Sequence, residues 1–269
     1  KNPLKELNSL IFDEKRMGSL GQTLMSFTNS YYSLRNLWSK DMWRVFDGIK
    51  KLWNKYDKNK EHSISALVKL LDNIITKLIA FMGLIEESIL VDQGLLLYFI
   101  GLQMEQASLT IEKCRALIVV KHDEQLEYEM LEALLTSHES LNIYRYSFKS
   151  YLNFENVINL ILLDKSYSRS LKYQLNRIKK DIFRLPKRTG DTSELTAIQE
   201  SITKACQLIE NATADQFSKV DKDAFTRREL DEYLASLSDL IHSTSISLTD
   251  MYFNHSDKQI QLINQNYTL

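Results

Sequence analysis

The chain has 269 residues, which is long enough to bury a substantial hydrophobic core. Its 7 glycines and 2 prolines are well below average usage, which favours helices joined by short polar loops over sheets with many tight turns. The formal net charge of −1 provides no bulk electrostatic attraction to nucleic acid or to an anionic membrane surface, so we expect neither as a partner.

Apolar residues recur at steps of three and four along most of the chain, the pattern of amphipathic helices. Asp92 is expected to cap the helix that follows it, because its side chain can accept from free backbone amides. The segment 116–122 is rich in β-branched residues, and we interpret it as a helix C-terminus because a lone strand would have no partner. The predicted fold is all-α, an elongated multi-helix bundle that forms a single domain over residues 1–269. Helices are expected at 19–37, 40–56, 67–82, 95–120, 124–147, 154–163, 168–185, 193–211 and 227–252.

One motif occurs twice in the chain, with a constant offset of 151 residues. In each copy a short apolar stretch ends at Asp13 or Asp164, and Ser19 or Ser170 follows six residues later. Asp and Ser side chains bond to nearby backbone groups and therefore favour helix ends. We interpret the motif as a helix–turn–helix corner in an internal pseudo-repeat. The alternative is that Asp164, Arg169 and Ser170 face a ligand, a role restricted to the second copy because the first has glycine in place of the arginine.

Cys114 and Cys206 each lie within an apolar helical pattern, which predicts buried thiols in a reducing compartment. The most apolar region, 78–104, is interrupted by acidic residues and falls short of the roughly 18 uncharged apolar residues that a spanning helix needs. The chain begins without methionine and without an apolar leader segment. We therefore expect a cytoplasmic protein, and a chain that is the C-terminal part or a fragment of a longer parent.

Familiar catalytic and metal-binding motifs are missing from the sequence. The five histidines form no H-E-x-x-H pair and none follows a glutamate at the Glu-x-x-His spacing of di-iron bundles. Neither of the common glycine-rich phosphate-binding loops occurs. We therefore expect no metal and no cofactor, assign no catalytic residue, and favour a chain that is not an enzyme by itself.

Two charged residues, Glu105 and Arg145, occur in strongly apolar helical contexts, where an unpaired charge would be costly. We expect them to form a buried ion pair with each other, or with Arg115 or Glu87. The alternative is a polar pocket in the bundle that receives a peptide or an amino acid. Six candidate ligand-binding residues would then converge: Glu87, Glu105, Arg145, Asp164, Arg169 and Ser170.

Aromatic residues are concentrated in the first quarter of the chain. The spacing of four of them leaves one or two difficult to bury on a single helix face. We favour an ordinary core, and the alternative is a protein-binding patch, because Trp and Tyr supply interface anchors. The interface candidates are Trp38, Trp43, Phe46 and Trp53.

Four segments together carry a family resemblance. LILLDKSYSRSLKYQLNRI at 160–178 combines a leucine-rich stretch, an aspartate, a short turn, Arg–Ser–Leu and Gln–Leu. Residues 143–151 supply a Tyr–Arg segment, and residues 38–49 a helix with Trp and Arg. Taken in their order along the chain, the four segments resemble the bacterial alpha-E family, from about Leu7 to Ile178. Segment 81–107 contributes the matching positions Gly83, Glu87, Ser88, Asp92, Gly101, Glu105 and Ala107.

The resemblance implies an all-α protein of poorly defined activity, encoded beside or fused to a circularly permuted ATP-grasp ligase and transglutaminase-like proteins. The chain departs from the usual pattern of the family in two ways. The family's usual first helix, with Glu–Arg–Ala–Glu, would precede this chain. In GLQMEQA, Leu102, Gln103 and Gln106 occupy positions where arginines are common in the family, so any anion binding by those arginines is largely lost here.

Three hypotheses from different classes follow. The favoured one is a non-catalytic accessory domain of an ATP-grasp-linked peptide ligation or tagging system, which predicts a large apolar interface and no compact site. The second is an enzyme or a peptide-binding protein with a carboxylate–arginine pocket. The third is a structural bundle that forms homo-oligomers through the aromatic residues of the first quarter of the chain.

Overall fold

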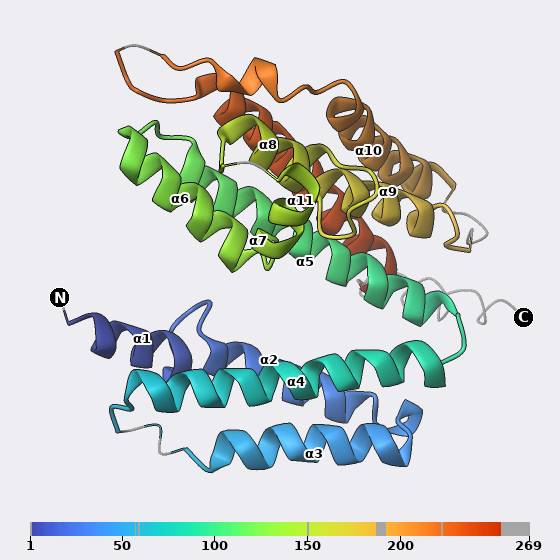
Figure 1. Ribbon diagram of the computed structural model, residues 1–269. Helices are drawn as coiled ribbons and strands as arrows, with labels where there is room; N and C mark the ends of the chain where they lie inside the picture. Colours follow the sequence, from blue (N-terminus) through green and yellow to red (C-terminus); the bar gives the residue numbers. More distant parts are fainter. Residues whose placement is uncertain are drawn as a thin grey trace, which may run out of the picture. The chain divides into compact units, whose positions relative to one another are not determined.

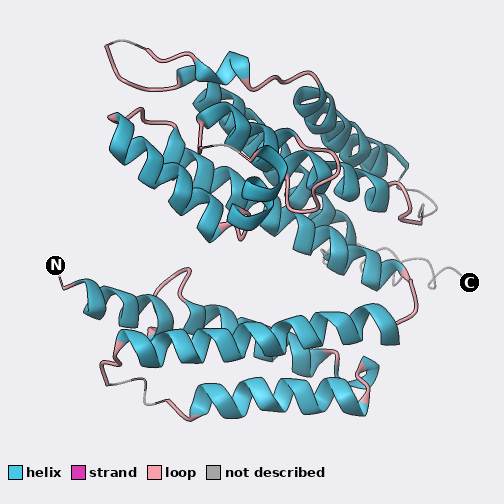
Figure 2. Ribbon diagram, viewed as in Figure 1, coloured by secondary structure: helices cyan, strands magenta, loops and turns pink. Residues whose placement is uncertain are grey.

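The computed structural model describes residues 2–56, 58, 60–149, 151–186, 192–221 and 223–253, with the backbone alone at 192–194. Over these residues it contains eleven α-helices and no strand (Figure 1), which confirms the predicted all-α fold. Figure 2 shows how short most of the connecting loops are. The chain divides into two compact units, Lys1–Leu90 and Val91–Leu269. A single domain and a repeat of its two halves remain predictions.

The described residues of the first unit form four α-helices and a single 3₁₀-helix. Each α-helix begins at a polar residue whose side chain accepts from an amide of the first turn. α4 packs along α3, and side chains from α1 to α4 share one buried core. The elements are α1 Pro3–Phe12, α2 Leu20–Ser33, the 3₁₀-helix η1 Arg35–Leu37, α3 Lys40–Asn54 and α4 Ile64–Ser88.

The second unit is built around α5. This helix packs against α6, α9 and α11, and α10 packs against both α9 and α11. Its N-cap is Asp92, whose carboxylate accepts from the Leu95 amide at 2.9 Å, as the sequence predicted. The elements are α5 Gln93–Ile118, α6 Glu124–Ser137, α7 Leu141–Phe148, α8 Phe154–Ile158, the π-helix η2 Asn159–Leu163, α9 Leu171–Ile182, α10 Thr192–Glu210, the 3₁₀-helix η3 Asp215–Ser218 and α11 Arg228–Phe253.

The helix expected over 124–147 is broken into α6 and α7. Glu139 adopts a left-handed backbone conformation with φ of 53°, which ends α6 without a glycine. The Ser140 amide then donates to the Leu135 carbonyl at 2.7 Å, the six-residue closure of a Schellman motif. The chain turns here, so the expectation of one continuous helix was wrong.

The segment 116–122 is only partly helical. α5 ends at Ile118, and Val120 then forms an isolated antiparallel bridge with Thr226. The Arg227 amide donates to the Val119 carbonyl at 2.8 Å, and the Lys121 amide donates to the Phe225 carbonyl at 2.7 Å. The β-branched residues therefore do find a partner, which a segment about 100 residues later in the chain provides.

Candidate functional site

The duplicated motif forms the same local corner in both units. The Ser19 hydroxyl donates to the Asp13 carbonyl at 2.6 Å and accepts from the Gln22 amide at 3.1 Å. The Ser170 hydroxyl likewise donates to the Asp164 carbonyl and accepts from the amide of the third residue after it at 3.1 Å. Both serines are fully buried N-caps. The motif therefore forms a helix–turn–helix corner in each unit, as the favoured interpretation expected, whereas the internal pseudo-repeat remains a prediction.

Asp164 also stabilises the turn that follows it. Its carboxylate accepts from the Ser166 amide at 2.7 Å, from the Ser166 hydroxyl at 2.7 Å and from the Tyr167 amide at 3.2 Å. Partial burial alone would raise the pKa of the Asp164 carboxyl, but these three donors bring that pKa below its usual value. The carboxylate is therefore engaged by its own loop.

Arg169 ties the second corner to the turn between α6 and α7. Its guanidinium donates to the His138 carbonyl at 3.2 Å and pairs with Glu139 at 2.7 Å. The Gln174 side chain donates to the Arg169 carbonyl at 3.0 Å. The arginine of the second copy thus positions a neighbouring turn, in addition to any contact that a ligand would make.

A buried chain of polar groups continues from that turn. His138 Nδ1 lies 2.8 Å from the Ser140 hydroxyl, which lies 2.8 Å from the Tyr167 hydroxyl. His138 Nε2 lies 3.2 Å from the Thr110 hydroxyl, which donates to the Gln106 carbonyl at 2.9 Å. A neutral imidazole with its proton on Nε2 satisfies every one of these contacts. Burial, together with the cations Lys113 and Arg169, lowers the pKa of His138 to about 4, so the imidazole is neutral at pH 7.

The other candidate ligand-binding residues do not form the buried ion pair that the sequence predicted. Glu105 is exposed on α5, and Arg145 is exposed on α7, where it pairs with Glu132 at 3.7 Å. Arg115 pairs with Asp231 at 2.7 Å. That expectation was wrong because each charged residue lies on the solvent side of its helix, away from the apolar residues beside it in the sequence.

The six candidates are thereby placed in four locations. Asp164, Arg169 and Ser170 share the second corner, whereas Glu105 and Arg145 lie on α5 and α7. Glu87 is exposed near the end of α4, in the first unit. A shared pocket remains a prediction.

A buried ion pair does exist between residues that the sequence analysis missed. The Arg227 guanidinium pairs with Glu127, donates to the Ile118 carbonyl at 2.7 Å and lies 3.9 Å from the centroid of the Phe154 ring. Arg227 and Glu127 are both buried. The pair fixes α6 and the start of α11 against the end of α5. Because 100 residues separate the partners in the sequence, no local pattern could have revealed the pair.

The early aromatic residues form a cluster in the first unit. The Tyr31 ring stacks on Phe46, with centroids 3.6 Å apart, and on Trp38, with centroids 5.0 Å apart, and Trp43 meets its edge at 4.8 Å. Phe46 and Trp53 are buried, whereas Trp38 and Trp43 are half-buried. The packing supports the favoured core interpretation, and an interface role for the four residues remains a prediction.

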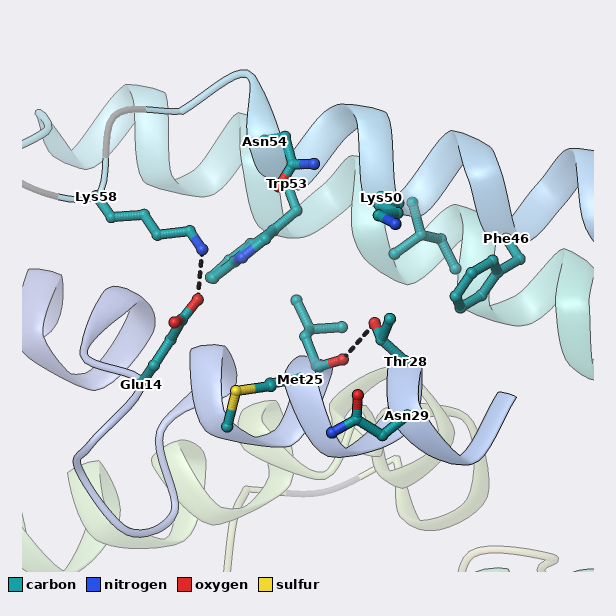
Figure 3. A pocket seen from close by; sticks show the side chains of 11 residues that line it. Glu14, Met25, Thr28, Asn29, Phe46, Lys50, Trp53, Asn54 and Lys58 are labelled. Atoms are coloured by element: carbon teal, nitrogen blue, oxygen red, sulfur yellow. Dashed lines mark hydrogen bonds and ion pairs between the residues drawn. The ribbon is translucent and has the colours of Figure 1, made fainter. Parts of the chain in front are cut away.

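A pocket of about 180 Å³ opens between α2 and α3 (Figure 3). Phe46 and Trp53 project into it from α3, and Met25 and Asn29 come from α2. An ion pair between Glu14 and Lys58 closes one end. The described lining contains no histidine or cysteine. Its Thr28 hydroxyl donates to the Leu24 carbonyl, Lys50 donates to the Tyr32 hydroxyl and Lys58 pairs with Glu14, so the pocket offers shape and apolar surface without evident chemistry.

α4 carries a line of exposed apolar side chains beside its buried face. Its core face contains Leu67, Leu70, Ile74, Phe81 and Ile85. A second line of aliphatic residues, spaced by four, seven and four residues, runs beside that face and stays exposed: Ile64 at 61%, Val68 at 51%, Ile75 at 47% and Ile79 at 64%. We call these four residues the α4 strip. The spacing places them on one side of the helix, over about four turns.

The remaining groups offer no metal centre or membrane span in the part of the chain that the structure describes. No three His, Cys, Asp or Glu side chains there are arranged to hold a metal ion. None of the described helices combines the length and the apolar character that crossing a bilayer requires. Cys114 and Cys206 are free and buried, as predicted, and burial raises their pKa values to about 12 and about 11.

Comparisons with known proteins place the chain among uncharacterised relatives. Residues 1–253 match a family described as a predicted alpha-helical domain with a conserved ER motif. The uncharacterised protein Rv2567 of Mycobacterium tuberculosis and the uncharacterised protein Mb2597 of Mycobacterium bovis are each 25% identical over 250 residues, which is 89% of this chain. The chain spans only 28% of the length of each relative. No solved structure matches the chain.

Proposed function

Because this chain belongs to the alpha-E family, we propose that it is an accessory interaction domain of an ATP-grasp-linked peptide ligation or tagging system and does not itself catalyse the reaction. The α4 strip is the observation that carries the proposal. Four aliphatic side chains that stay about half-exposed along one helix favour a partner that removes them from water.

The surroundings of the reactive side chains support a non-catalytic role. Both thiols are buried with raised pKa values, which keeps them protonated and unreactive at neutral pH. His138 is neutral, and both of its ring nitrogens lie within hydrogen-bond distance of a hydroxyl group. Arg169, Asp164 and Ser170 make contacts that hold the second corner together.

The length of the relatives is consistent with an accessory domain. The M. tuberculosis protein is more than three times as long as the region that matches this chain, so the region occurs there within a larger protein. The partners that we propose, an ATP-grasp ligase and a transglutaminase-like protein, rest on the family's usual setting.

Co-purification tests the proposal. The chain is purified with and without an ATP-grasp ligase encoded beside it, and ATP turnover and product mass are measured. We expect a complex and a change in turnover that Ile79→Asp abolishes, because a charge in the strip would have to be desolvated on binding. Asn73→Asp adds the same charge to an exposed position elsewhere on α4 and should leave the complex intact.

Two results would count against the proposal. One is the absence of any complex, together with unchanged ATP turnover. The other is a doubling of molecular mass in solution that Ile79→Asp reverses, because the strip would then join two copies of this chain and the protein would be a structural oligomer.

A further inference from the structure

The α4 strip has a chemical asymmetry that restricts its partner. Ser65, Asp72, Thr76 and Gly83 follow one another at steps of seven, four and seven residues, so they form a line beside the strip on its solvent side. Glu86 lies seven residues after Ile79 and therefore ends the strip itself. The line itself contains no lysine or arginine, and its one charged member, Asp72, is acidic. Lys69, four residues after Ser65, is exposed on the side of the line that faces away from the strip.

The two carboxylates at the strip are available to a partner. Asp72 and Glu86 are both exposed, and neither has an ion-pair partner among the residues that the structure describes. By contrast, Glu6, Asp41 and Glu14 of the same unit form ion pairs with Arg16, Arg44 and Lys58. Both carboxylates lie nearer to the strip than Lys69 does, so positive charge that approaches the strip would meet a net negative edge.

The shape of the strip selects a helical partner. The exposed residues are aliphatic, lie along one helix and keep the spacing of four and seven residues at which two helices interlock their side chains. An extended peptide would need an exposed sheet edge to satisfy its backbone, whereas a helix satisfies its own backbone and can bury an apolar face directly.

We propose that the α4 strip binds one amphipathic helix of a partner protein, with an apolar stripe facing Val68, Ile75 and Ile79 and with lysine or arginine along the flank that meets Asp72 and Glu86. This inference rests on the proposed function and adds the chemistry of the partner's contacting element. The partner helix needs about 15 to 20 residues to follow the strip from Ile64 to Ile79.

Two synthetic helical peptides of about 20 residues test the inference against the full chain. They share one leucine stripe and differ only on one flank, which carries lysine in the first and glutamate in the second. Fluorescence polarisation measures both affinities. We expect the lysine peptide to bind about 5- to 10-fold more tightly, since two exposed charge pairs contribute modestly.

Two variants separate the apolar and the charged contributions. Ile75→Asp with Ile79→Asp should abolish binding of both peptides, and circular dichroism checks that the helices persist. Asp72→Lys with Glu86→Lys should reverse the preference towards the glutamate peptide. The matched control, Glu112→Lys with Asp239→Lys, makes the same change in net charge at exposed positions of α5 and α11 and should preserve the preference for lysine.

The outcomes distinguish this inference from the proposed function. Equal binding of the two peptides, tighter binding of the glutamate peptide, or no reversal by Asp72→Lys with Glu86→Lys would overturn the inference. If neither peptide binds but Ile79→Asp still abolishes the ligase complex, the helical partner is wrong and the interaction domain stands. If neither peptide binds and Ile79→Asp leaves the ligase complex unaffected, both proposals fail.

Discussion

Ser19 and Ser170 each use one hydroxyl twice, as a donor to an aspartate carbonyl and as an acceptor for the first turn of a helix. A side-chain N-cap contributes about 1 kcal/mol, and a buried carbonyl that loses its donor costs a similar amount. Both serines are fully buried, so water cannot replace either contact. The corner explains why serine follows the aspartate in both copies without reference to a ligand.

Ser170→Ala is therefore expected to lower the free energy of unfolding by about 2 kcal/mol, measured by urea denaturation. Ser166→Ala removes a hydroxyl from the same turn, but one that is exposed, and should cost less than about 1 kcal/mol. Equal effects of the two substitutions would contradict the account of the buried hydroxyl.

His138 makes stability depend on pH. Its pKa is about 4 in the folded protein and about 6.5 in the unfolded chain, so between these values the unfolded state binds a proton that the folded state does not. The contribution of His138 to the free energy of unfolding is therefore fully present above pH 6.5. It decreases as the pH drops towards 4, by about 3 kcal/mol at most. Urea denaturation at pH 7, 6 and 5 measures the loss. His138→Gln should flatten this dependence, and an unchanged slope would show that other groups cause it.

At the scale of elements, the N-caps of the helices are the feature that the sequence predicts most clearly. Asp92 and the serines before α2, α3, α4 and α9 all begin helices, and each lies just before an apolar periodic stretch. The end of α6 is different. Glu139 takes a left-handed conformation that glycine or asparagine usually occupies, so nothing in the residue types marks the break.

Gly83 offers a simple test of helix energetics in α4. It lies in the helix interior, and a Cβ added there would meet no atom within 4 Å. Gly83→Ala should therefore raise the free energy of unfolding by about 0.5 to 1 kcal/mol, because alanine loses less backbone entropy on folding. Thermal and urea denaturation measure the change. Gly21→Ala is the contrasting variant, since a Cβ there would lie 3.1 Å from the Phe12 carbonyl oxygen, and it should destabilise the protein.

At the scale of the whole molecule, the two units bury separate cores. The larger core takes its buried residues from Leu96 to Tyr252, and the smaller one takes its buried residues from Ile11 to Ile74. The helical content and most boundaries could be predicted from periodicity. The Arg227–Glu127 pair could not, because it depends on two helices that meet only in the folded chain. Glu105 and Arg145 were assigned to the interior from their apolar neighbours, and a helix turns by about 100° between neighbours, which is enough to place them in solvent.

Residues 91–253, produced without the first unit, are expected to fold with full helicity and a cooperative urea transition, because the described buried residues of their core all lie between Leu96 and Tyr252. Circular dichroism and NMR chemical-shift dispersion measure this. A broad urea transition together with poorly dispersed amide chemical shifts would show that the second unit depends on the first.

The burial of both native thiols has a practical consequence for labelling. Alkylating reagents attack the thiolate, and the raised pKa values of Cys114 and Cys206 keep that species scarce at neutral pH. A cysteine introduced at the exposed Ser65, beside the α4 strip, would be the fast-reacting thiol without removal of either native one. The rate at which it is alkylated then reports directly on whether the strip is covered, in a cell extract as readily as with a purified partner.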